Sequence, residues 1–210
     1  MTSNDRVRNT SKRRWKIVSG GQTGVDRAGL VAAMSAGLPF GGWVPQGRRA
    51  EDGIVSMAFH AMRESANPGY RWRTRANIQD SDATLILADS VPLNGGTALT
   101  AAIAEELRKP CKIVCLGADD TAAQIRDWML SLEWSVPERP FGQIVLNVAG
   151  PRESKAPGIF KRARQVLEEV FADFQNEGGG DFYSMDTGRE TLPMVAESPE
   201  PPDANEPRTV

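Results

Sequence analysis

The sequence has few of the residues that metal sites and catalytic triads require. Its 210 residues include 2 cysteines and 1 histidine. Cys111 and Cys115 lie in the β-branched stretch CKIVC, which as a strand would separate them by about 13 Å, whereas bridged Cα atoms lie roughly 4.4–6.8 Å apart. A disulfide between them is therefore excluded, and no spacing of Cys and His indicates a metal held by the protein. His60 lies in IVSMAFHAMRES, whose spacing predicts a helix, and one such side chain is a poor basis for a Ser-His-Asp triad.

Long apolar runs and a strong charge imbalance are also missing. No apolar run approaches the roughly 20 residues that a membrane span needs, and the start MTSNDRVRNTSKRR has no apolar region after its charges. The formal net charge of -2 argues against a protein that coats nucleic acid. These features and the unbridged thiols favour a cytoplasmic protein with neither a membrane nor a nucleic acid as partner.

The two ends of the sequence differ from its middle in composition. Residues 1–13 are polar, and residues 175–210 contain NEGGGD and ESPEPPDANEPR, which offer little to bury. We expect a disordered leader over 1–13, a single ligand-binding domain over 14–174, and an acidic Pro/Gly-rich disordered tail over 175–210.

Between these ends, short apolar runs alternate with helical patterns. Strands are predicted over 15–19, 38–44, 83–88, 111–116 and 143–150, and helices over 24–36, 52–65, 97–108, 120–132 and 157–174. Strands that are apolar throughout are typical of sheets with both faces covered. The alternation predicts a Rossmann-like three-layer α/β sandwich with a mostly parallel sheet.

Ligands of such folds bind beyond the carboxyl ends of the strands. The loop SGGQTGVDR follows the first strand and carries three glycines. Its backbone N–H groups and the start of the next helix suit a phosphate or another oxyanion. The loop lacks the first glycine of the dinucleotide fingerprint, where Ser19 stands, and no Lys-Ser/Thr pair follows it as in a P-loop. A helix cap is the alternative, because Thr23 and Asp26 have the spacing of a capping box.

A second glycine-rich loop, NGGTALT, also precedes a predicted helix and is likewise suited to bind an oxyanion. The alternative to ligand binding is a Gly-rich turn with Thr97 as the helix cap. Arginines of nearby loops can bind oxyanions, and aspartates can accept hydrogen bonds from a pterin or purine; surface solvation and capping are the alternatives. The predicted ligand-binding residues are Gly20, Gly21, Gln22, Thr23, Gly24, Asp26, Arg27, Arg48, Arg49, Asp89, Asn94, Gly95, Gly96, Thr97 and Arg152. No catalytic residue is predicted.

Five segments in order carry a family resemblance: SGGQTGVDRAGL, GGWVPQGRRAEDG, YRWRTRANIQDSDATLIL, NGGTALT and LNVAGPRESKAPGI. Together they resemble the molybdenum cofactor carrier proteins, a Rossmann-like group. That group is similar to the lysine-decarboxylase-like, cytokinin-activating phosphoribohydrolases, whose signature is P-G-G-x-G-T-x-x-E. In NGGTALT, Thr100 stands where their catalytic Glu is expected, so the resemblance does not imply hydrolysis by that mechanism.

The resemblance implies a carrier that binds the molybdenum cofactor, a pterin with a molybdenum oxyanion and a terminal phosphate, and stores it or delivers it to molybdoenzymes. It implies no turnover and a homo-oligomer. The alternative is a nucleotide-binding or nucleotide-processing enzyme of the same superfamily.

Overall fold

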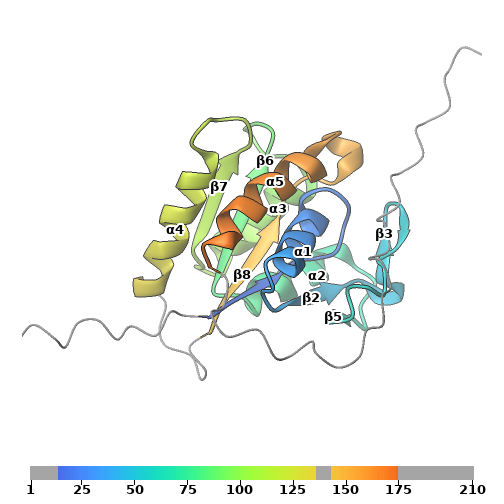
Figure 1. Cartoon of the computed structure of the whole chain (residues 1–210). Coiled ribbons are helices and arrows are strands. Elements are labelled where there is room, and N and C mark those ends of the chain that lie inside the picture. Colours follow the sequence, from blue (N-terminus) through green and yellow to red (C-terminus); the bar gives the residue numbers. More distant parts are fainter. Residues whose placement is uncertain (1–13, 136–142, 175–210) are drawn as a thin grey trace, which may run out of the picture. The chain divides into compact units, whose positions relative to one another are not determined.

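A sheet of six parallel strands forms the middle layer of the fold (Figure 1). The computed structural model describes residues 14–135 and 143–174. The strands are β1 (Arg14–Val18), β2 (Phe40–Val44), β5 (Met62–Glu64), β6 (Ala83–Ala88), β7 (Cys111–Cys115) and β8 (Gln143–Ala149). Their spatial order is β5-β2-β1-β8-β6-β7. The Rossmann-like α/β prediction is thus confirmed, with a main sheet that is wholly parallel.

Within the described ranges, five α-helices cover the two faces of this sheet. The helices α1 (Val25–Ser35), α4 (Thr121–Ser135) and α5 (Ile159–Ala172) lie on one face, and α2 (Tyr70–Gln79) and α3 (Gly95–Glu106) lie on the other (Figure 1). The short 3-10 helices η1 (Gln46–Arg48) and η3 (Glu153–Lys155) lie in loops. A small antiparallel hairpin joins β3 (Arg49–Ala50) to β4 (Gly53–Ile54). The predicted leader over 1–13 and tail over 175–210 lie outside the described residues.

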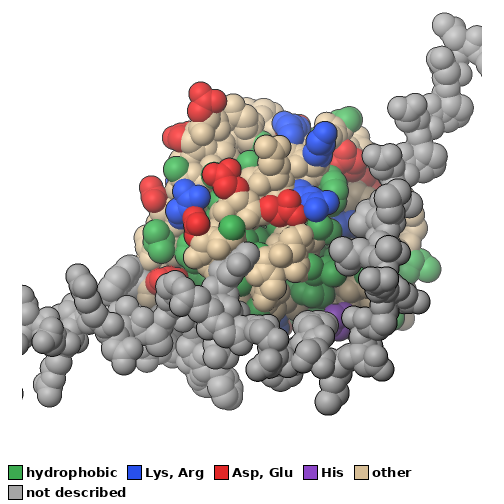
Figure 2. All heavy atoms as spheres, in the orientation of Figure 1, with side chains coloured by type: hydrophobic (Ala, Val, Ile, Leu, Met, Phe, Trp, Pro, Cys, Tyr) green, Lys and Arg blue, Asp and Glu red, His purple; other side chains and the backbone are tan. Residues whose placement is uncertain are grey.

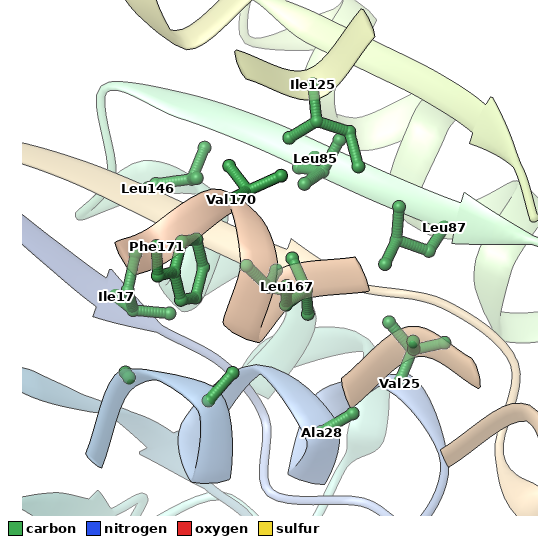
Figure 3. Close-up of a cluster of buried hydrophobic side chains, with 14 of the residues drawn as sticks. Ile17, Val25, Ala28, Leu85, Leu87, Ile125, Leu146, Leu167, Val170 and Phe171 are labelled. Carbon is green, nitrogen blue, oxygen red and sulfur yellow. The ribbon is translucent and has the colours of Figure 1, made fainter. Parts of the chain in front are cut away.

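The larger core lies between the sheet and the layer of α1, α4 and α5 (Figure 3). Leu85 and Leu87 of β6 point into it and are fully buried, as are Leu167 and Phe171 of α5. All six residues of β6 are buried, because helices cover both sides of the strand. Each fully buried aliphatic side chain stabilises the fold by about 1.5–3 kcal/mol, so this layer fixes where the strand ends lie.

The predicted helix over 52–65 is wrong. Val55, Phe59 and Met62 are buried at helical spacing, but Val55 and Phe59 lie in a turn region after β4, and Met62 begins β5. The Arg48 side chain donates to the carbonyl oxygens of Val55 at 3.1 Å and Phe59 at 3.3 Å. It also donates to Ser56 O at 3.1 Å. Side-chain donors therefore satisfy carbonyls that helical N–H groups would otherwise satisfy.

His60 consequently lies in a turn rather than on a helix. Its side chain is exposed, and its ring meets the ring of Phe40 edge-on at 5.5 Å between centroids. The next segment, Met62–Glu64, pairs in parallel with Gly42–Val44 and forms an edge strand of the sheet that the sequence did not predict.

The helix α2 was not predicted either, because its sequence YRWRTRANIQ has little apolar periodicity. Only Asn77 and Ile78 of this helix are buried. Asn77 accepts a hydrogen bond from the backbone N–H of Trp43 at 2.8 Å and donates to its carbonyl at 3.0 Å. The helix is thus fixed to β2 by one amide side chain that satisfies both backbone groups of Trp43.

Acidic and basic side chains are intermingled on the face drawn in Figure 2. Arg164 pairs with Glu168 at 2.9 Å, and Arg162 of the same helix pairs with Asp89 at 2.5 Å. No helix within 14–135 or 143–174 is long and apolar enough to cross a membrane.

Candidate functional site

A pocket of about 320 Å³ opens at the edge of the sheet where β1, β6 and β8 end. This volume is at the lower end of the range of about 300–1,000 Å³ that is typical of small-molecule sites. Its lining residues are Gln22, Asp26, Tyr70, Arg73, Thr74, Asn94, Gly95, Gly96, Thr97, Leu99, Gly150, Pro151, Arg152 and Lys155. Three loops that follow strands and the first turns of α2 therefore meet around one space.

The loop after β6 presents unpaired backbone donors to this pocket. The first backbone bond of α3 runs from the N–H of Ala98 to the carbonyl of Asn94, so the N–H groups of Gly95, Gly96 and Thr97 precede the helical hydrogen bonds. A Cβ added at Gly95 or Gly96 would meet no atom within 4 Å. The positive end of a 12-residue helix is therefore open to the pocket.

Neither of the two helix caps considered as alternatives to ligand binding forms. The residue before α3 is Asn94, which makes no side-chain capping bond, and Thr97 is the third residue of the helix. The residue before α1 is Gly24, so neither Thr23 nor Asp26 caps that helix. Neither helix has a side-chain cap, because Gly24 has no side chain and the Asn94 side chain makes no capping bond.

The loop after β1 uses its glycines for packing inside the protein. Gly24 has a φ of 72°, and a Cβ there would lie 2.3 Å from the carbonyl oxygen of Pro151. The neighbouring N–H of Val25 donates to that same oxygen at 3.2 Å. Gly21 has a φ of 71°, and a Cβ there would lie 3.1 Å from a Val44 methyl group. These glycines allow the loop to approach the rest of the protein closely.

A buried ion pair lies beneath the pocket. Arg73 Nη1 donates to a carboxylate oxygen of Asp26 at 3.1 Å, and their side chains are 13% and 6% exposed. Arg73 Nη1 occupies the space next to Gly20, where an added Cβ would lie only 1.4 Å from it. Gly20 is therefore required to let the guanidinium reach Asp26.

Burial raises the pKa of the Asp26 carboxyl, and the charge of Arg73 together with the backbone amides of Gln22 and Gly150 opposes that rise. Within the described residues, the Nε atom of Arg73 is buried and has no hydrogen-bond partner. Arg73 thus lines the pocket, and its buried Nε–H group is a donor without a partner in this part of the protein.

The loop after β8 completes the pocket with two further cations. Arg152 and Lys155 both line it, and Arg152 Nε lies 3.2 Å from a carboxylate oxygen of Glu51. A Cβ added at Gly150 would lie 2.3 Å from the carbonyl oxygen of Leu87, so this loop is packed directly against the end of β6. Three cationic side chains, one from α2 and two from the loop after β8, therefore surround the pocket.

Seven of the predicted ligand-binding residues line the pocket, namely Gln22, Asp26, Asn94, Gly95, Gly96, Thr97 and Arg152. Others are engaged elsewhere. Arg27 donates to both carboxylate oxygens of Asp52 at 2.5 and 3.0 Å. Arg49 Nη2 donates to the carbonyl of Pro68 at 3.2 Å. Arg48 donates to carbonyl oxygens of the turn region after β4. Asp89 pairs with Arg162, and the Thr23 hydroxyl donates to Glu51.

Sequence reasoning missed the contribution of α2. Tyr70, Arg73 and Thr74 are spaced three and four residues apart, which places them on one helix face, and all three line the pocket. A helix prediction over this segment would have exposed that pattern. In the described ranges, no group of three or more His, Cys, Asp or Glu side chains could hold a metal ion.

Comparison with known proteins agrees with this fold. Residues 17–171 match the model of the circularly permutated YpsA SLOG family. The chain belongs to this family. The match spans the whole pocket, from Gln22 to Lys155.

Among solved structures, this SLOG chain is similar to a protein from Syntrophus aciditrophicus SB that bears the name putative molybdenum carrier protein. The two are 40% identical, with a TM-score of 0.67, over 76% of this chain and 96% of the other. The resemblance inferred from the five sequence segments is thereby confirmed. No curated protein matches the chain.

Proposed function

We propose that this SLOG chain binds the molybdenum cofactor as cargo in the pocket beyond β1, β6 and β8, and stores it or delivers it to molybdoenzymes. The observation that carries the proposal is the set of donors around one space: the open start of α3 together with Arg73, Arg152 and Lys155. The 40% identity to a protein named as a molybdenum carrier supports the choice of ligand.

The anionic groups of the cofactor fit the cationic part of the pocket. Its terminal phosphate suits the N–H groups of Gly95 and Gly96, because a helix start offers both unpaired donors and a positive dipole end. Arg152 and Lys155 lie on the facing loop and can neutralise a second anionic group, such as the molybdenum oxyanion.

The pterin ring fits the remaining walls. Tyr70 is 47% exposed and, with Leu99, offers an aromatic and apolar surface against which a flat ring can pack. The Gln22 amide can donate hydrogen bonds to a pterin edge, and the Asn94 amide can both donate and accept them. The pocket thus has hydrogen-bonding groups for the pterin ring between two regions that favour anions, the start of α3 and the loop after β8.

A nucleotide enzyme is the second candidate, because a nucleoside monophosphate has the same combination of phosphate and flat ring. Thr100, which stands where the related phosphoribohydrolases carry Glu, is 5% exposed and donates to the carbonyl of Gly96 at 2.9 Å. Asp26 is the carboxylate among the pocket-lining residues, and Arg73 holds it. These contacts favour binding without turnover.

The test is native mass spectrometry of protein purified under argon from a host that makes the cofactor, followed by calorimetry with isolated molybdenum cofactor. We expect Arg152→Ala to weaken binding about ten- to a hundredfold, because it removes a charge-assisted contact worth about 1.5–3 kcal/mol. Arg164→Ala is the matched control, since its side chain is 43% exposed against 45% for Arg152 and it lies outside the pocket.

Two results would overturn the proposal. One is a parent protein that neither carries nor binds the cofactor. The other is release of free adenine from adenosine monophosphate above background, which would favour the nucleotide enzyme.

A further inference from the structure

We propose that Glu51, which lies outside the pocket lining, is a positioning residue that holds the pocket's Arg152 in place for an anionic ligand. The inference rests on the proposed function and adds to it a residue of the β3–β4 hairpin region. Glu51 follows β3 directly and is the first residue of the turn to β4.

The Glu51 carboxylate is bonded to two loops that are distant in the sequence. It accepts hydrogen bonds from the Thr23 hydroxyl, from the Ser154 backbone N–H at 3.1 Å and from the Ser154 hydroxyl at 2.5 Å. Arg152 Nε lies 3.2 Å from its second oxygen. One carboxylate thus joins the loop after β1 to the loop after β8.

The backbone of Glu51 fixes a second pocket residue. Its N–H donates to the side-chain oxygen of Gln22 at 2.9 Å, and the N–H of Thr23 donates to the same oxygen at 3.0 Å. Gln22 lines the pocket. The two functional groups of Glu51 therefore act on different residues, the carboxylate on Arg152 and the amide on Gln22.

The contact with Arg152 leaves that side chain ready for a ligand. Glu51 is bound on the Nε side, and within the described residues the two terminal nitrogens of Arg152 have no protein partner. Because the Arg152 side chain is 45% exposed, it would otherwise sample many rotamers. Ordering it in advance removes part of the entropy that binding would cost.

The carboxylate is suited to this task because it keeps its charge. Burial opposes ionisation, but the bonds from Ser154 and Thr23 and the charge of Arg152 outweigh it, so the pKa of Glu51 is lowered. Its side chain is 18% exposed. The opposite effect would arise if the Glu51 carboxylate competed with the ligand for Arg152. Removing the charge of Glu51 would then strengthen binding.

The experiment compares the affinity for isolated molybdenum cofactor, measured by calorimetry under argon, in the full-length parent and in Glu51→Gln, Arg152→Ala and the double variant. Glu51→Gln keeps the backbone N–H that holds Gln22, so it tests the carboxylate alone. We expect affinity to fall roughly three- to tenfold, as for losing the advance ordering of one long side chain. In the Arg152→Ala background, the same substitution should have no further effect.

Asp52→Asn is the matched control, because Asp52 belongs to the same hairpin and holds Arg27, which does not line the pocket. It should lower the melting temperature while leaving the affinity unchanged. The inference is overturned if Glu51→Gln binds as well as the parent or better, if its effect persists without Arg152, or if Asp52→Asn weakens binding equally. A parent without affinity would overturn the proposed function as well, whereas a deficit in Arg152→Ala alone would overturn only the role of Glu51.

Discussion

The glycine-rich loop after β1 and the one after β6 differ in what surrounds their glycines. At Gly24 an added Cβ would lie 2.3 Å from a backbone oxygen, and at Gly20 it would lie 1.4 Å from a guanidinium nitrogen. At Gly95 and Gly96 it would meet nothing within 4 Å. Two loops with similar sequences therefore use glycine for different purposes, one for packing within the protein and the other for an open helix start.

The comparison teaches that a glycine-rich loop is not by itself a sign of ligand binding. The first loop positions side chains from elsewhere: Gly20 makes room for Arg73, and Gly24 lets the loop after β8 come close enough to place Arg152. The second loop offers its own backbone. Substitutions can separate these two roles, because the first should change stability and the second should change binding.

The largest effect is expected at Gly24. Gly24→Ala places a methyl group against the Pro151 carbonyl and forces a side chain into positive φ, and neither problem can be relieved by rotating a side chain. Strain and overpacking together should lower the free energy of unfolding by roughly 2–6 kcal/mol. Urea denaturation measures this loss, and a loss below about 0.5 kcal/mol, as is usual for exposed sites, would show that both loops tolerate side chains alike.

A smaller, pH-dependent loss is expected at Gly20. Gly20→Ala displaces the guanidinium of Arg73 from Asp26, which leaves a buried carboxylate without its charged partner and should cost roughly 1–3 kcal/mol near neutral pH. The double variant with Arg73→Met should be little less stable than Arg73→Met alone, because the guanidinium is then absent and only Asp26 Oδ2, at 2.7 Å from an added Cβ, remains close to Gly20. Additive losses would contradict this account.

The sign of the pH dependence follows from Asp26. Its pKa in the folded protein is raised above the ordinary value of 3.8, and losing Arg73 raises it further. Between the two pKa values, the folded chain holds a proton at Asp26 that the unfolded chain has released. The folded state therefore loses stability as the pH rises through its own, higher pKa. The deficit of Gly20→Ala should therefore be smaller near pH 5 than near pH 8, as thermal melts at the two pH values can check.

The smallest change in stability is expected at Gly96. Gly96→Ala adds a helix-favouring residue in open space, which should leave the fold unchanged or stabilise it by about 0.5–1 kcal/mol. Its methyl group occupies space beside the N–H groups proposed to bind phosphate, so affinity for isolated molybdenum cofactor should fall. Calorimetry beside a thermal melt tests both parts, and unchanged affinity would mean that the open helix start is not used.

The sequence was sufficient for every strand of the main sheet except β5, but not for the region between β2 and β6, where β5 lies. Val55, Phe59 and Met62 are buried as their spacing indicates, yet the same spacing arises here from turns that lead into the strand β5, and Arg48 donates to carbonyls that a helix would use. The helix α2, by contrast, forms without an apolar periodicity that would predict it. A polar residue, Asn77, provides its main attachment to β2.

The site was predictable where it depends on backbone and unpredictable where it depends on side-chain pairing. The open start of α3 follows directly from NGGTALT. The sequence does not show which arginine side chains bond to other parts of the protein. Arg48 and Arg49, which bond to backbone carbonyls, therefore could not be told apart from Arg152, which lines the pocket. For the same reason Arg73 was overlooked. These side-chain pairings depend on contacts between segments that are distant in the sequence.

The place of β8 in the sheet governs when the chain can fold. Its residues pair with β1 on one side, as between Arg14 and Gln143, and with β6 on the other. Until Gln143–Ala149 has left the ribosome, a nascent chain has two separate half-sheets with unpaired edges beside apolar residues such as Ile17 and Leu85, a state prone to aggregation. The high contact order of this closing step makes folding late and slow relative to synthesis of the earlier strands.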